Sequence, residues 1–326
     1  MQFISIKLTQ VATIMIILCH LCQFYGNELH CWFDVGVQIF LCMSGYLFGK
    51  KVSPEIDGFD FYKKRFVKIL VDYYVTILLA MVLELLFVPS SVSAKGMMGA
   101  ILLYRQMEGG GHLWYIPYIL LCYLLTPFLV RFFSRFQKES SLFFSIVIAL
   151  LVSNYVDYAF FNYFNPAWIN CYLIGLFLGF CEEKGRLQLF RLMERLLFLG
   201  CLILNPLQIY LQYRLHRDMN GGFLFYLIKT NAHMLLGCTL FLGMQWVFHF
   251  WKMDRMHRVL DLVDQYSYDI YLTHHFLIIG PLSLMEVTDS PVVNILLVLL
   301  LTGIFSVVVH GMAVWLKKGF HKFQFG

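Results

Sequence analysis

The sequence predicts an all-α membrane protein, a polytopic bundle of about ten transmembrane helices with both termini in the cytoplasm. Hydrophobic residues make up 60% of the 326 residues, charged residues only 14%, and the mean hydropathy is +0.69. Soluble domains are about a quarter charged, so this chain has too few charges to cover a soluble surface. The apolar residues are gathered in long runs, and most basic residues lie between alternate runs.

This composition excludes a soluble enzyme, a nucleic-acid-binding protein and a disordered chain as first interpretations. The net charge of +5 has a simpler explanation in the topology described below. Among the nine cysteines only Cys19 and Cys22 have the Cys-x-x-Cys spacing, so no two such motifs form a pair, and most cysteines lie in apolar runs. They therefore indicate small buried side chains, with neither a structural disulfide nor a metal site.

Each expected helix corresponds to one apolar run, because a membrane span needs about 20 mostly apolar residues. The runs cover approximately residues 8–25, 32–49, 66–88, 113–133, 141–158, 167–182, 195–213, 230–250, 267–285 and 291–316. They lack the alternation that barrel strands require. Pro117, Pro127 and Pro206 interrupt two of them. The first run has no small-residue cleavage site after it, so we expect a retained helix.

The distribution of Lys and Arg predicts the orientation. Twenty of the 25 basic residues lie in the termini and in segments 50–68, 131–138, 184–195 and 252–258, all on one side of a ten-span chain. Basic residues concentrate on the cytoplasmic side of membranes, so this side is predicted to be cytoplasmic. No connecting segment is long enough to fold alone, which predicts a single membrane-embedded domain over residues 1–326.

Ionisable side chains inside apolar spans are costly and are therefore functional candidates. They are His20, Asp72, Glu84, Asp269, His274, His275 and His310. His20 lies 13 residues beyond Lys7, or about 20 Å deeper along a helix. An imidazole titrates near neutral pH, so His20 is either a general base or proton relay, or a neutral side chain hydrogen-bonded to a neighbouring helix.

Three further segments are unusually polar. Residues 61–70 are the densest basic cluster, with Lys64, Arg65 and Lys68, and Lys68 is spaced to pair with Asp72 at i, i+4. The cluster either sets the topology or binds a phosphorylated cytoplasmic ligand.

The two other segments lie further along the chain. Residues 109–117 place three glycines before His112 and Trp114, a flexible turn followed by an aromatic that is an interfacial anchor or a ligand contact. Residues 267–275 hold two Tyr, one Asp and two His, which predicts a functional role for at least one of them.

Ordered motifs carry a resemblance to a known family. They are Leu-x-x-Val-Ala…His in the first run, Gly-Val-x-x-Phe…Ser-Gly-Tyr-Leu in the second, the basic run, Gly-His-Leu-Trp-Tyr, and Ser-Tyr-x-Ile-Tyr-Leu-x-His in the ninth. Together the chain resembles, over nearly its whole length, the acyltransferase 3 family of bacterial integral-membrane O-acyltransferases, in the stand-alone form.

The resemblance implies a single acyltransferase domain in the bacterial inner membrane. Such enzymes move an acyl group, usually acetyl, from cytoplasmic acetyl-CoA to a hydroxyl of a surface, exported or lipid-linked glycan. The implied partners are acetyl-CoA as co-substrate, the glycan or lipid-linked sugar acceptor and membrane lipid, without a metal or nucleic acid. Whether the chain forms a homo-oligomer is left open.

The resemblance also implies site residues. His20 and His274 are the implied catalytic residues, with His20 either a general base or an acceptor of the acetyl group. Lys64, Arg65 and Lys68 are implied to hold the phosphates of the donor. The remaining implied substrate or oxyanion contacts are Ser44, His112, Trp114, Asp269 and Tyr271.

Two positions depart from the family pattern. Relatives usually carry a cation eleven residues before the first-helix histidine, and Thr9 stands here. Eleven residues leave only about 20° of rotation, so that cation would share the face of His20, whereas Lys7 lies about 140° away. Either another cation fills the role or the donor is held differently. Gln38 stands where many relatives have an acid.

A transporter or flippase for a glycan or its lipid-linked precursor is the alternative function. Buried His and Asp with Pro-containing helices suit proton-coupled transport, but no internal repeat relates the two halves of the chain. A non-catalytic scaffold or sensor is a third interpretation. Cleavage of a thioester by the purified protein separates the enzyme from both.

Overall fold

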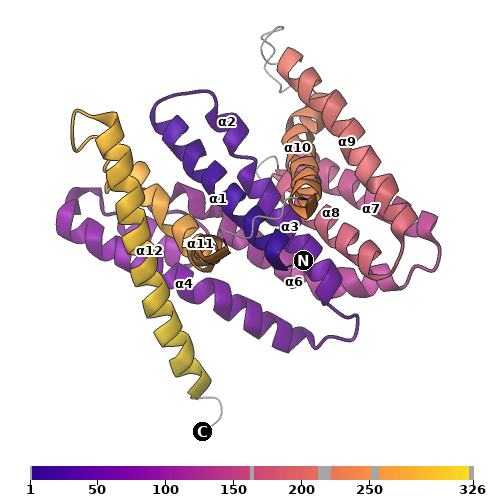
Figure 1. Cartoon of the computed structure of the whole chain (residues 1–326), viewed down its shortest axis with the longest axis horizontal. Coiled ribbons are helices and arrows are strands. Elements are labelled where there is room, and N and C mark those ends of the chain that lie inside the picture. The colour runs from indigo at the N-terminus through magenta and orange to yellow at the C-terminus, as the bar shows by residue number, and fades with distance from the viewer. Residues whose placement is uncertain (1, 162–164, 212–221, 251–256, 323–326) are drawn as a thin grey trace. The chain divides into compact units, whose positions relative to one another are not determined.

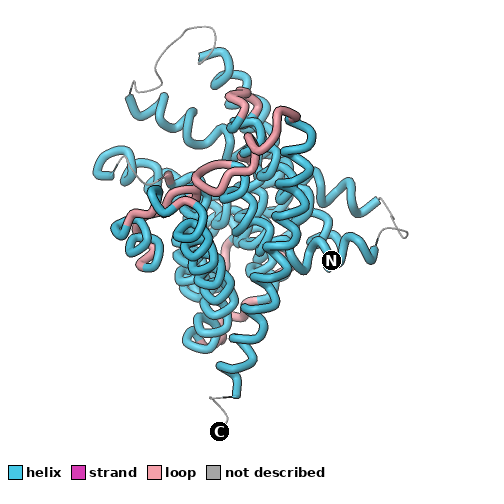
Figure 2. The backbone as a smooth tube through the Cα atoms, turned by 90° about the vertical axis from the view of Figure 1, so that its left-hand side faces the viewer, coloured by secondary structure: helices cyan, strands magenta, loops and turns pink. Residues whose placement is uncertain are grey.

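The computed structural model describes residues 2–161, 165–211, 222–250 and 257–322, and in those ranges every regular element is helical (Figure 2). The segment 252–258 lies partly outside these ranges. So does part of the segment between the expected runs 195–213 and 230–250, of which residues 222–229 are helical. The elements are α1(Gln2–Phe24), α2(His30–Phe33), α3(Gly36–Lys51), α4(Gly58–Phe87), η1(Pro89–Ser91), α5(Ala94–Ile101), η2(Gly111–Trp114), α6(Tyr115–Ser134), α7(Glu139–Val156), η3(Asp157–Phe161), α8(Pro166–Glu183), α9(Leu187–Ile209), α10(Gly222–Phe250), α11(His257–Ile278) and α12(Pro291–Lys322).

The all-α prediction is confirmed, and each expected run falls on a helix of at least 16 residues. In the described ranges, six stretches are long and apolar enough to cross a membrane. They are His30–Lys51, Gly58–Phe87, Gly111–Ser134, Glu139–Phe160, Gly222–Phe250 and Pro291–Gly319. The chain is thus a multi-pass membrane protein. The count of about ten spans and the cytoplasmic termini stay predictions.

Some predicted boundaries were wrong. α4 begins at Gly58, so the basic cluster lies on the first turns of a long helix and not in a loop. Asp60 in its first turn complements the positive end of the helix, and Phe61 is buried, so the local sequence supports this extension. Pro127 and Pro206 lie inside α6 and α9 without ending them, as neighbouring helices permit in membranes.

The described chain forms two compact, interleaved units. The first unit comprises Met1–Leu8, Asp34–Asp57 and Cys122–Met253, and the second comprises Thr9–Phe33, Gly58–Leu121 and Asp254–Gly326. The first unit therefore holds α3 and α7 to α10, while the second holds α4, α5, α11, α12 and most of α1. Each unit is described by itself below.

Backbone contact between α3 and α8 is the main packing feature of the first unit. Gly45 and Gly49 on α3 face the α8 backbone, and Gly175 and Gly179 on α8 face the α3 backbone. A Cβ atom built at Gly175 would lie only 2.0 Å from the carbonyl oxygen of Cys42, and the other three positions are as tight. Ser44 and Gly45 form a Ser-Gly step, which in an apolar helix predicts close packing of this kind. α9 and α10 lie side by side in the same unit (Figure 1).

The second unit packs α1, α11 and α12 together at one end and α4 against α12 further along. Leu21 of α1 and Ile278 of α11 share an apolar cluster with Val298 of α12. Val75 of α4 packs with Val309 on α12. The first of these clusters fixes the faces that α1 and α11 present to one another.

A buried ion pair also joins α4 to α12. The ammonium group of Lys317 donates to both carboxylate oxygens of Asp72 at 2.8 Å, and to the backbone carbonyl of Lys68 at 3.4 Å. Asp72 therefore pairs with a cation 245 positions away in the chain. The sequence predicted only its i, i+4 neighbour Lys68 as a partner.

Lys317→Met is expected to reduce the free energy of unfolding by about 2 kcal/mol, because it leaves the buried Asp72 carboxylate without this cation. The reduction falls below that of a fully buried pair because the side chain of Lys317 is 25% exposed. Thermal unfolding of the detergent-solubilised protein measures it. The exposed neighbour Lys318→Met is the control, and an equal loss there would show that the Lys317–Asp72 pair contributes nothing.

Candidate functional site

Four histidine rings gather in the second unit, and we call them the imidazole cluster: His20 of α1, His112 of η2, and His274 and His275 of α11. The ring centre of His20 lies 4.4 Å from that of His275 and 5.2 Å from that of His274. The ring of His112 lies 4.7 Å from His275, nearly parallel to it, and 5.3 Å from His274. The other three side chains are buried, whereas His20 is partly exposed.

Hydrogen bonds decide which nitrogen carries the proton in the two most buried rings. His274 donates from Nδ1 to the carbonyl oxygens of Ile270 and Tyr271, at 3.0 and 2.8 Å. Its Nε2 therefore holds the lone pair, and this buried atom has no hydrogen-bond partner among the described residues. His112 donates from Nε2 to the carbonyl of Leu272 at 3.0 Å, and its buried Nδ1 likewise has none in the described chain.

The other two rings follow the same rule. His275 donates from Nδ1 to the carbonyl of Gly109 at 2.6 Å, and His20 donates from Nδ1 to the side-chain oxygen of Gln23 at 3.0 Å. Because a carbonyl oxygen only accepts, the ring nitrogen that bonds to it carries the hydrogen in each case. The other nitrogen of each ring holds a lone pair whenever that ring is neutral. A neutral ring of the cluster can then accept a proton, which is the property that a general base requires.

Two glycines bring the loop before η2 against the end of α11. Gly109 and Gly280 adopt φ angles of +68° and +114°, which side chains rarely tolerate. A Cβ at Gly280 would lie 2.4 Å from the Cα of Gly109. The hydroxyl of Tyr271 donates to the carbonyl of His112 at 2.5 Å and holds η2 from the other side. The glycine-rich turn expected from the sequence therefore positions His112.

In the structure, Tyr271 and Asp269 form hydrogen bonds to other residues of the protein. The hydroxyl hydrogen of Tyr271 is used in its bond to His112, so it does not point toward an oxyanion in this arrangement. Asp269 is buried and accepts from Nδ1 of His310 at 2.8 Å, while its other oxygen has no partner among the described residues. Both side chains brace α11 at the site.

The remaining candidates lie elsewhere. Trp114 lies two residues after His112 and packs edge-on with Tyr115 and Tyr118, at 6.3 and 5.6 Å between ring centres. Ser44 belongs to the first unit, where its hydroxyl lies 3.3 Å from that of Tyr123.

The basic cluster lies on α4 of the second unit. Lys64 and Lys68 are exposed, and the guanidinium of Arg65 lies 5.8 Å from the ring centre of Phe61. The exposed ammonium groups leave these residues accessible to a ligand from solution.

His275 is the residue whose position sequence reasoning missed. The sequence marks it as an ionisable group in an apolar run, but the family resemblance implies a role for His274 and none for His275. In the structure its ring lies nearest to both His20 and His112. The signal that was present in the sequence is the His-His pair itself.

A metal centre is not evident in this arrangement. In the described part of the chain, no group of three or more His, Cys, Asp or Glu side chains is placed to hold a metal ion. The chemistry that the cluster can perform with its own groups is proton transfer or nucleophilic attack by an imidazole.

Comparison with known proteins agrees with the motifs. The family model described as an acyltransferase domain, of the acyltransferase 3 type, matches residues 11–311. Searches of curated proteins and of solved structures found no match. The matched range contains His20, the basic cluster and all of α11. Because the model spans nearly the whole chain, this protein belongs to the acyltransferase 3 family.

Proposed function

We propose that this protein is a membrane O-acetyltransferase of a bacterial inner membrane. It takes acetyl from cytoplasmic acetyl-CoA and transfers it to a hydroxyl of a surface or lipid-linked glycan. The observation that carries the proposal is the imidazole cluster, in which three separate segments of a family member gather four proton-accepting rings. No comparable feature supports the transporter or flippase.

His20 is the proposed base, because it is the only partly exposed ring of the described cluster and a substrate hydroxyl can reach it. The acceptor hydroxyl gives its proton to Nε2 of His20 while its oxygen attacks the thioester carbonyl carbon. A C–O bond forms, the C–S bond breaks, and the sulfur of CoA leaves as a thiolate. The protonated ring then returns the proton to that thiolate, so the products are the acetyl ester and CoA thiol.

His274, His275 and His112 position this base. His275 meets His20 edge-on, and its anchor on Gly109 fixes the plane of its own ring. His274 presents its unpartnered lone pair within the same cluster.

The donor phosphates are assigned to Lys64, Arg65 and Lys68. Arg65→Gln with Lys68→Gln is expected to weaken acetyl-CoA binding at least about tenfold, because each change removes a charge-assisted contact. Binding is measured by isothermal titration of the purified protein.

Arg135→Gln with Lys138→Gln removes the same charge from exposed positions outside residues 61–70 and serves as the control. If both pairs bind acetyl-CoA like the unmodified protein, the cluster only sets the topology.

The activity itself is tested with purified protein in liposomes containing a lipid-linked glycan and radiolabelled acetyl-CoA. We expect label in the glycan and an equal amount of CoA thiol. Intact acetyl-CoA together with glycan movement across the bilayer would instead identify a transporter. Parallel reactions with succinyl-CoA and longer acyl-CoA donors define the acyl group.

A further inference from the structure

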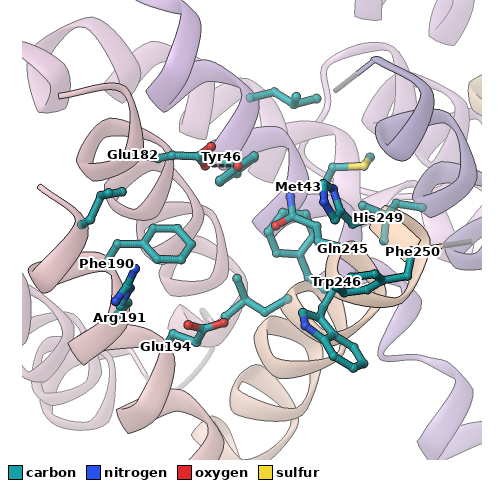
Figure 3. A pocket seen from close by; sticks show the side chains of 15 residues that line it. Met43, Tyr46, Glu182, Phe190, Arg191, Glu194, Gln245, Trp246, His249 and Phe250 are labelled. Atoms are coloured by element: carbon teal, nitrogen blue, oxygen red, sulfur yellow. Dashed lines mark hydrogen bonds between the residues drawn. The ribbon is translucent and has the colours of Figure 1, made fainter. Parts of the chain in front are cut away.

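The first unit contains a cavity of about 610 Å³ between α3, α8, α9 and α10 (Figure 3). It has the size of a small-molecule site. Its lining includes the aromatic rings of Tyr46, Phe190, Phe241, Trp246 and Phe250 and the imidazole ring of His249. No residue of the imidazole cluster or the basic cluster belongs to its lining, so the proposed acyl transfer does not use this cavity.

The charged groups of the cavity are not equivalent. Glu182 is neutralised, because Lys50 donates to one of its carboxylate oxygens at 2.5 Å and the hydroxyl of Tyr46 donates to the other. Arg191 and Glu194 make no such contacts in the described part of the chain. They lie three residues apart on α9, so they are neighbours on one helix face, and both line the cavity.

The cavity therefore offers one cation and one anion side by side. Figure 3 places both on the α9 wall, with Trp246 and Phe250 on the α10 wall opposite. A ligand that satisfies both must itself carry an anion next to a cation. An aromatic wall adds a preference for the cation, because the faces of Trp and Phe rings attract ammonium groups.

The rim shows that the ligand also has an apolar part. Leu187, Trp246 and Phe250 line the cavity and are 49%, 68% and 68% exposed. These residues lie at the start of α9 and the end of α10, next to basic segments that we expect at the inner membrane surface. Tryptophan is typical of that depth, where lipid headgroups meet hydrocarbon.

We propose that this cavity binds a zwitterionic membrane phospholipid whose headgroup joins a phosphate to a primary ammonium. Arg191 holds the phosphate, Glu194 holds the ammonium, and the acyl chains leave over Trp246 and Phe250. An anionic lipid without an amine leaves Glu194 unpaired in the cavity. A soluble zwitterion has no acyl chains to contact the apolar rim. The proposal is independent of the acyl-transfer chemistry.

The test measures competition for the purified full-length protein in detergent micelles, using fluorescent phosphatidylethanolamine displaced by unlabelled phosphatidylethanolamine or phosphatidylglycerol. We expect the ethanolamine lipid to bind about tenfold more tightly, the value of one charge-assisted contact. Glu194→Gln should remove that preference, and Arg191→Gln should weaken both lipids.

Matched controls are Glu183→Gln and Arg195→Gln, exposed residues near the cavity that do not line it. They should bind like the unmodified protein. Equal affinity of the unmodified protein for both lipids, or tighter binding of phosphatidylglycerol, overturns the proposal without any variant having to fold. Preserved preference in a monodisperse Glu194→Gln protein also overturns it. Loss of acetyl transfer in liposomes would not bear on this result.

Discussion

His20→Ala is expected to reduce acyl transfer by about 10²–10⁴-fold, the usual contribution of a general base. Acetyl-CoA should still bind, because the proposed phosphate contacts are on α4 and not on α1. The remaining rings of the cluster donate to carbonyls of their own, so the variant should also fold. Acetyl release and label transfer in liposomes, together with calorimetric binding, separate chemistry from affinity.

His30→Ala is the matched control, since this histidine lies in α2 of the same unit but outside the cluster. It should retain near-normal transfer. If His20→Ala also retains it, His20 is a packed core residue and His274, with its unpartnered Nε2, becomes the candidate base. Complete loss, with an acetylated histidine trapped in the unmodified protein, would instead assign His20 as the acyl carrier.

Gly175→Ala is expected to reduce the free energy of unfolding by about 3 kcal/mol or more, the upper end of the range for overpacking. The new methyl group would lie 2.0 Å from a backbone carbonyl of α3, where no flexible side chain can move aside. The two helices must separate along their whole crossing. Fluorescence-detected gel filtration after heating measures the loss of folded protein in detergent.

Gly243→Ala on α10 gives the comparison, because nothing lies within 4 Å of a Cβ at that position. Alanine favours a helix over glycine, so this variant should be as stable as the unmodified protein or more so. A Gly175→Ala protein that is equally stable would mean that the α3–α8 backbone contact is not needed for the fold of the first unit.

Helix positions and family could be predicted because the signals are local. In lipid, backbone polar groups must be satisfied within the segment, so a long apolar run folds as a helix whatever its neighbours are. The Ser-Gly step at Ser44 is also a local signal, because small residues in an apolar helix allow the backbones of two helices to approach closely. His20 and His274 were found because ionisable groups are rare in such runs, and His112 was found through the family resemblance.

Tertiary structure alone decided how these residues meet. His275 joins the cluster through contacts with residues 166 positions away in the chain, and Asp72 takes a cation 245 positions away. The hydroxyl of Tyr271 donates to the carbonyl of His112. Arg191 and Glu194 line a cavity together with residues of α10. A hydropathy pattern records whether a face is buried, but not which distant group buries it. The partners of each polar side chain are therefore set by packing between helices.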